Sequence, residues 1–83
     1  MTRILPAPAD LPPLVPVQSS HLKAVAYNER TGDMTVQFKD GGVYSYHGVP
    51  SNIHGELMGA PSKGKFFRQA VKGRFRTTPL RRA

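Results

Sequence analysis

Apolar and polar residues alternate through the middle of the chain. The segment 34–38 (MTVQF) has apolar residues at its first, third and fifth positions, which is the period of a half-buried strand. Segments 21–27 (HLKAVAY) and 43–47 (VYSYH) predict two further strands. Polar and glycine-containing turns separate them at 28–33 (NERTGD) and 39–42 (KDGG), and Asp-Gly is a strong hairpin signal. The pattern predicts an antiparallel three-stranded meander.

A short helix is expected after the third strand. Pro50 suits a first helical position, because a proline there loses no hydrogen bond. Ile53 and Leu57 are four residues apart and share one helix face, while Gly59 and Pro61 predict the end of the helix.

A second helix is predicted over residues 63–72 (KGKFFRQAVK), with Ser62 as its N-cap. At 100° per residue, one side of this helix is apolar and the other is polar and basic. The apolar side contains Phe66, Phe67, Ala70 and Val71, and the opposite side contains Lys65, Arg68, Gln69 and Lys72. The second helix therefore has one face for the core and one basic ridge, and Phe75 is expected to return to the edge of the core.

These elements predict an α+β fold in which a three-stranded antiparallel meander is followed by two short helices packed on one face (βββαα). Residues 17–76 form the expected domain. Residues 1–16 contain five prolines and predict a flexible, extended arm. Residues 77–83 are expected to be a basic C-terminal tail.

Composition narrows the functional classes. The chain has 83 residues and no cysteine, which excludes disulfides, thiolate metal sites and thiol catalysis, and fits a cytoplasmic protein. No apolar run reaches the ~18 residues of a membrane span. The three histidines lack the spacing of metal ligands, and no carboxylate pair is positioned for acid–base work. We therefore expect a non-catalytic binding protein with no cofactor, no metal and no membrane partner.

Charge is concentrated at one end of the chain. Residues 1–56 contain four basic and five acidic residues, whereas residues 57–83 contain eight basic residues and no acidic ones. A concentrated positive field attracts polyanions and speeds their encounter. Nucleic acid, an acidic protein surface and anionic lipid all fit such a field. A basic tail that serves solubility is the simpler alternative.

The basic residues predict a nucleic-acid interface that begins at the second helix. Its N-terminus offers unpaired N–H groups to an anion, so Ser62 and Gly64 predict a phosphate contact. Capping by Ser62 and close packing at Gly64 explain the same residues equally well. The predicted nucleic-acid-binding residues are Lys63, Lys65, Arg68, Lys72, Arg74 and Arg76. One or two exposed tyrosines beside the ridge could stack on bases.

Several short motifs, in order along the chain, together resemble the KTSC domain family, which also occurs at the C-terminus of some lysyl-tRNA synthetases. The resemblance covers about 17–75 and is carried by Ser19-Ser20, Val25, Tyr27, Val36-Gln37-Phe38, Gly41 or Gly42, Tyr44-Ser45-Tyr46, Val49-Pro50, Leu57, Ala60, Ser62-Lys63-Gly64, Phe66-Phe67 and Arg74-Phe75. Pro61 departs from the family pattern, as does Phe75, where tyrosine is more frequent. The resemblance implies a small bacterial or phage α+β domain without assigned catalytic residues. The synthetase fusion implies RNA only by analogy.

The sequence thus predicts a small nucleic-acid-binding module, with RNA favoured over DNA, that contacts phosphates through its C-terminal basic face. Four to six phosphate contacts would give a log–log salt slope of roughly −3 to −5. The alternative is an adaptor, or a phage-encoded modulator, that docks on an acidic surface of a host protein. The sequence leaves the oligomeric state open.

Overall fold

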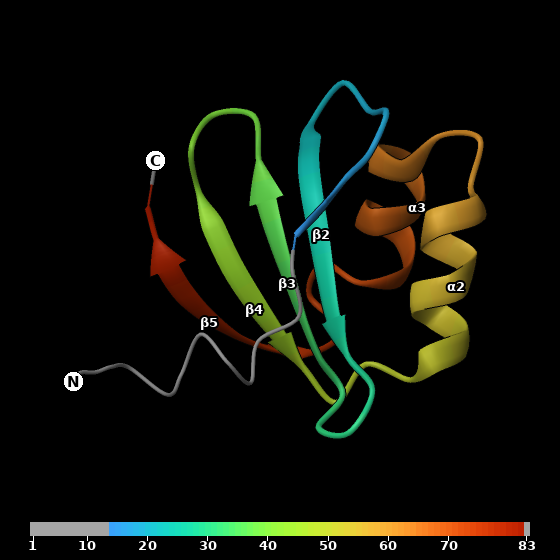
Figure 1. Cartoon of the computed structure of the whole chain (residues 1–83), viewed down its shortest axis with the longest axis vertical. Coiled ribbons are helices and arrows are strands. Elements are labelled where there is room, and N and C mark those ends of the chain that lie inside the picture. The colour runs from blue at the N-terminus through green and yellow to red at the C-terminus, as the bar shows by residue number, and fades with distance from the viewer. Residues whose placement is uncertain (1–13, 83) are drawn as a thin grey trace, which may run out of the picture.

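The fold is described by a computed structural model for residues 14–82. Most of the predicted N-terminal arm lies outside these residues. Along the chain the elements are β1 (Val15–Pro16), β2 (Leu22–Asn28), β3 (Asp33–Phe38), β4 (Val43–His47), α2 (Ser51–Gly59), α3 (Lys63–Ala70) and β5 (Arg76–Arg81). The protein is an α+β fold, with both helices packed against one face of an antiparallel sheet (Figure 1).

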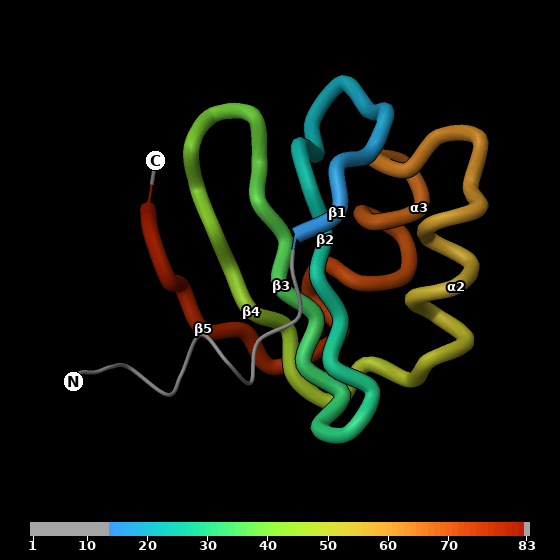
Figure 2. Tube along the Cα trace, in the orientation of Figure 1, coloured from blue at the N-terminus to red at the C-terminus, as the bar shows by residue number. Residues whose placement is uncertain are grey.

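The prediction of a three-stranded sheet is wrong, because the sheet has five strands in the order β1-β2-β3-β4-β5. Strand β5 pairs with β4 and comes from the segment predicted to be a tail. Every β5 side chain is exposed and Pro79 interrupts the segment, so it lacks an alternating apolar pattern; proline is tolerated there because β5 is an edge strand. Strand β1 pairs with β2 over two residues at the other edge (Figure 2).

The three central strands and both helices are confirmed, with small shifts at their ends. Strand β4 has the predicted bounds, and α3 ends at Ala70 rather than at residue 72. Pro50 occupies the N-cap of α2 instead of its first turn. Gly73 follows α3 with a φ of 77°, a backbone conformation that favours glycine and lets the chain turn back toward β5.

The core lies between the sheet and the helices. Strands contribute Leu22, Val25, Met34, Val36 and Tyr46, and the remainder comes from Val49, Leu57, Phe67 and Val71. Phe75 packs against this cluster, as predicted. The predicted apolar side of α3 is confirmed, because Phe67 is buried and Phe66 is half-buried, while Arg68 is exposed. The basic ridge therefore lies outside the core.

Candidate nucleic-acid interface

A groove of about 570 Å³ lies between α3 and the helix-facing side of the sheet. It is lined by His21, Leu22, Phe38, Asp40, Tyr44, Tyr46, Gly64, Phe67, Arg68, Lys72 and Thr77. Its volume is within the ~300–1,000 Å³ typical of small-ligand pockets. The register explains which strand residues meet here. Val36 is opposite Tyr44 and Tyr46 is opposite Thr77, so these side chains share one face of the sheet.

Four aromatic rings form the interior of the groove. Phe67 meets the rings of both Phe38 and Tyr46 edge-to-face, with centroids 5.4 and 5.3 Å away. Phe38 in turn meets Tyr44 edge-to-face at 5.8 Å. Phe67 and Tyr46 are buried, whereas Phe38 and Tyr44 are only half-buried. Burial also raises the pKa of Tyr46 to about 12, so its hydroxyl stays neutral at physiological pH. The rings available to a ligand are thus Phe38 and Tyr44.

Two of the predicted basic residues, Arg68 and Lys72, line this groove. Both are exposed, as is Lys65, which precedes Arg68 by three residues on the same side of α3. Together Lys65, Arg68 and Lys72 form what we call the basic ridge. The structure therefore brings the ridge and the aromatic groove side by side.

The start of α3 has contacts within the protein. The Ser62 hydroxyl accepts a hydrogen bond from the Lys65 N–H at 3.4 Å, which confirms its predicted role as N-cap. The Lys63 ammonium donates to the Ala60 carbonyl at 3.2 Å. A side chain at Gly64 would place its Cβ 3.3 Å from the His21 ring, so Gly64 permits close packing. Each of these three residues thus has a contact within the protein: a cap at Ser62, a hydrogen bond at Lys63 and close packing at Gly64.

The last two predicted residues follow α3 in the chain. The Arg74 Nε donates to the Gln69 carbonyl at 3.0 Å, at the end of α3. Arg76 is opposite His47 in the β4–β5 register, whereas groove-lining Thr77 is its neighbour in the strand. Adjacent strand residues point to opposite faces, so Arg76 is on the face away from the groove.

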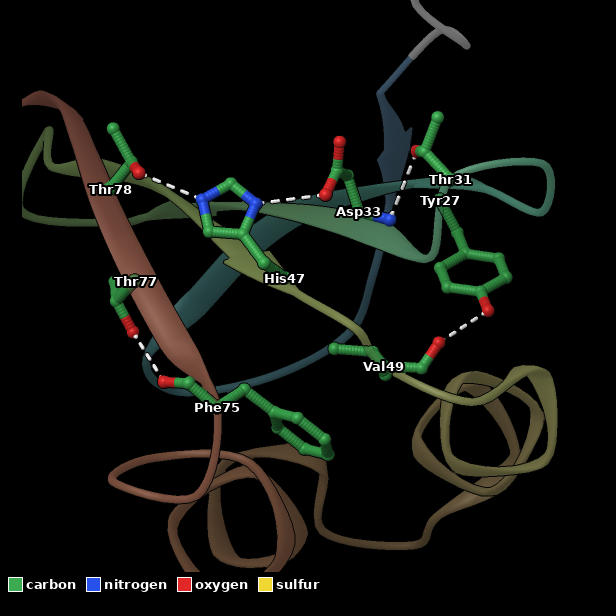
Figure 3. A network of polar contacts seen from close by, with 8 residues as sticks. All are labelled: Tyr27, Thr31, Asp33, His47, Val49, Phe75, Thr77 and Thr78. Carbon is green, nitrogen blue, oxygen red and sulfur yellow. Dashed lines mark hydrogen bonds and ion pairs between the residues drawn. The ribbon is translucent and has the colours of Figure 1, made fainter.

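On that opposite face, a polar network joins three strands (Figure 3). The His47 Nδ1 lies 2.8 Å from the Asp33 carboxylate, and Nε2 lies 2.7 Å from the Thr78 hydroxyl. The carboxylate only accepts, so Nδ1 donates, and in the neutral ring Nε2 accepts from Thr78. The hydrogen bond from His47 lowers the pKa of Asp33.

This network was not predicted, because it depends on β5. Its hydroxyl–imidazole–carboxylate order is that of a hydrolase triad, but catalysis also needs donors for an oxyanion and a site for substrate. The groove is on the other face of the sheet and contains none of Asp33, His47 or Thr78. The hydrogen bonds of this network link β5 to β4 and β4 to β3.

No helix in residues 14–82 is long and apolar enough to cross a membrane. The same stretch contains no cluster of three or more histidine or acidic side chains suited to a metal ion.

Comparison with known proteins identifies the fold. Residues 18–75 match the KTSC domain. The chain belongs to this family. The crystal structure of a KTSC domain protein from Yersinia pestis superposes with a TM-score of 0.81 at 35% identity, covering 83% of this chain and 97% of that one. The predicted resemblance is thereby confirmed.

Two sequence relatives differ in size. A lysine–tRNA ligase of Nostoc punctiforme is 38% identical over 68 residues, which are 82% of this chain but 12% of the ligase. The matching part of such cyanobacterial ligases is their C-terminal region. A protein of Tsukamurella paurometabola is 35% identical over 65 residues, which cover 78% of this chain and 97% of that protein. The KTSC domain thus occurs both within a large enzyme and as nearly the whole of a small protein.

Proposed function

We propose that this KTSC domain protein binds nucleic acid, with RNA preferred over DNA, through the basic ridge Lys65, Arg68 and Lys72. The observation that carries the proposal is the position of Arg68 and Lys72, which are both exposed and both line the aromatic groove. The ridge would then contact the phosphates of the nucleic acid and the adjacent groove would contact its bases.

Electrostatics supports a polyanion as the partner. Within residues 14–82 the ion pair joins His47 to Asp33, and no carboxylate pairs with Arg68 or Lys72. No ion pair among these residues therefore neutralises the two cations, and Asp40 is the one carboxylate that shares their groove. Such contacts neutralise phosphates and release counterions, which gives affinity with little sequence selectivity.

The relatives favour RNA among the polyanions. The lysine–tRNA ligases act, by their name, on a tRNA, and their C-terminal region is the part that resembles this chain. The match covers only 12% of the length of the ligase. The enzymatic activity of the ligase is therefore not part of the proposal. What transfers to the proposal is the class of partner, and the chain itself is expected to be non-catalytic.

The proposal is tested by fluorescence anisotropy with labelled single-stranded RNA, duplex RNA and duplex DNA at several salt concentrations. The test variant carries Arg68→Ala and Lys72→Ala. Loss of two phosphate contacts should flatten the log K against log salt slope for single strands by about 1.4. Wild type should bind RNA at low salt, and the variant should bind it more weakly.

A charge-matched control separates a local contact from net charge. The control carries Lys23→Ala and Arg30→Ala, which remove two exposed cations from β2 and the β2–β3 turn. It should retain the wild-type slope. Equal effects of the two double variants would show that only overall charge matters, and no binding by folded wild type at low salt would refute the proposal.

A further inference from the structure

We infer that the groove between α3 and the sheet binds an unstacked nucleobase, so that the protein selects single-stranded RNA over duplex RNA. This inference rests on the proposed function and specifies which form of nucleic acid the interface binds. It assigns Tyr44 and Phe38 as the stacking residues and Arg68 and Lys72 as the phosphate contacts beside them.

The aromatic rings favour a flat, apolar ligand. Phe38 and Tyr44 stand edge-to-face on the sheet, and both remain partly exposed after folding. Phe67 supports Phe38 from α3 at 5.4 Å, so the partly exposed rings rest on a buried one. Every base offers a π-face, which makes such rings sequence-tolerant stacking platforms.

The one carboxylate on the groove lining favours a base over a phosphate at its own position, away from Arg68 and Lys72. Asp40 is on the lining, and its Oδ1 already accepts a hydrogen bond from the Gly42 N–H at 2.9 Å. A phosphate inside the groove would be repelled by this carboxylate. A base is neutral, and an exocyclic amino group can donate to a carboxylate. The phosphates would lie at Arg68 and Lys72, on the α3 side.

The location of the rings explains the expected selection against duplexes. The faces of paired bases are covered by their neighbours in the stack, and an A-form helix presents phosphates and groove edges instead. A base reaches Tyr44 only after it leaves the stack, which is least costly in a single strand. A duplex would therefore meet the basic ridge without filling the groove.

The test compares two ligands of similar charge per phosphate: a single-stranded RNA octamer, and inorganic polyphosphate of matched length, which has no bases. Binding is measured by calorimetry for wild type, Tyr44→Ala, Tyr44→Phe and the Arg68/Lys72 double alanine variant. Loss of stacking at one base should weaken RNA binding by Tyr44→Ala roughly 5- to 100-fold. Polyphosphate binding by the same variant should not change.

The remaining variants and a duplex ligand test the roles assigned to the ring and to the cations. Tyr44→Phe keeps the ring and should keep the RNA affinity, whereas the double alanine variant should weaken both ligands. Wild type should also bind the single-stranded octamer more tightly than a duplex of the same sequence. Far-UV circular dichroism verifies that each variant is folded, and the comparison of RNA with polyphosphate on wild type needs no variant.

The outcomes separate the two proposals. If wild type binds RNA and polyphosphate equally, binds single strand and duplex equally, and loses nothing in Tyr44→Ala, the groove is not a base site and the inference is overturned. The ridge would then still account for salt-dependent binding. If folded wild type binds neither ligand at low salt, the proposed function fails, and the inference fails with it.

Discussion

The hydrogen bond between Thr78 and His47 is a side-chain contact that joins β5 to β4, in addition to the backbone pairing of the two strands. Thr78→Val removes the hydroxyl but keeps a β-branched side chain of the same shape. A side-chain hydrogen bond contributes a net ~0.5–1.5 kcal/mol. Thr78 is exposed and the His47 side chain is 29% exposed, which places this bond in the lower part of that range, ~0.5–1 kcal/mol. A loss of that size lowers the Tm of so small a domain by roughly 2–8 °C.

The assay is urea unfolding at pH 7, followed by far-UV circular dichroism, on a double-mutant cycle. The cycle contains wild type, Thr78→Val, His47→Ala and the double variant. His47→Ala also removes the hydrogen bond to Asp33, so it should cost more than Thr78→Val. Once His47 is absent, Thr78→Val should cost almost nothing, which gives a coupling energy close to the loss in the single Thr78 variant.

Thr35→Val is the matched control, because Thr35 lies opposite Ser45 in the β3–β4 register and therefore on the same face of the sheet. It should change the free energy of unfolding by less than ~0.5 kcal/mol. If Thr78→Val behaves like this control and the two single effects add within ~0.3 kcal/mol, then His47 does not hold β5.

Two further predictions concern pH and backbone. His54 stacks on Tyr27 with centroids 4.5 Å apart, and burial lowers its pKa, so the unfolded chain takes up a proton near pH 6.5 before the folded one does. Stability should therefore fall as the pH drops from 7 to 5, and thermal melts of His54→Gln should show a flatter profile; identical profiles would contradict this. Gly55→Ala should stabilise α2 by ~0.5–1 kcal/mol, because a Cβ there meets nothing within 4 Å. Gly73→Ala also has open space but a φ of 77°, so urea unfolding should show a loss of ~1–2 kcal/mol; equal effects at the two glycines would refute the backbone argument.

Local patterns were sufficient for the central part of the fold. The alternation in 34–38 predicts the buried side chains of β3, since Met34 and Val36 are fully buried. The helical period likewise separates Phe67 from Arg68, and Ser62 is the N-cap as predicted. In each case the interaction that decides the structure lies within a few residues along the chain.

The edge strands could not be predicted in this way. Strand β5 buries no side chain, and its sequence RTTPLR contains a proline and two arginines. It is a strand because β4 offers a row of backbone partners and because His47 reaches Thr78, 31 residues away. Edge strands with charge and proline also resist unwanted pairing with other chains, so the features that hide β5 from sequence analysis suit an edge.

The same limit applies to the candidate site. Helical spacing predicts that Lys65, Arg68 and Lys72 form one ridge, because all three lie within α3 or the turn directly after it. It gives no information on Arg76, whose direction is set by the register of β5 on β4. The groove depends on a contact between distant elements, in which Phe67 of α3 packs on Phe38 and Tyr46 of the sheet.

That contact ties the proposed binding surface to the stability of the fold. Phe67 and Arg68 are successive residues on a helix, so they are separated by about 100° around its axis. When Phe67 packs against the rings of Phe38 and Tyr46, Arg68 is brought to the edge of the groove. The position of Arg68 at the edge of the aromatic groove thus follows from the packing of the core. The same geometry implies that a change at Phe67 would displace Arg68 as well as weaken the core, whereas a change at Tyr44 would alter the groove and leave the ridge in place.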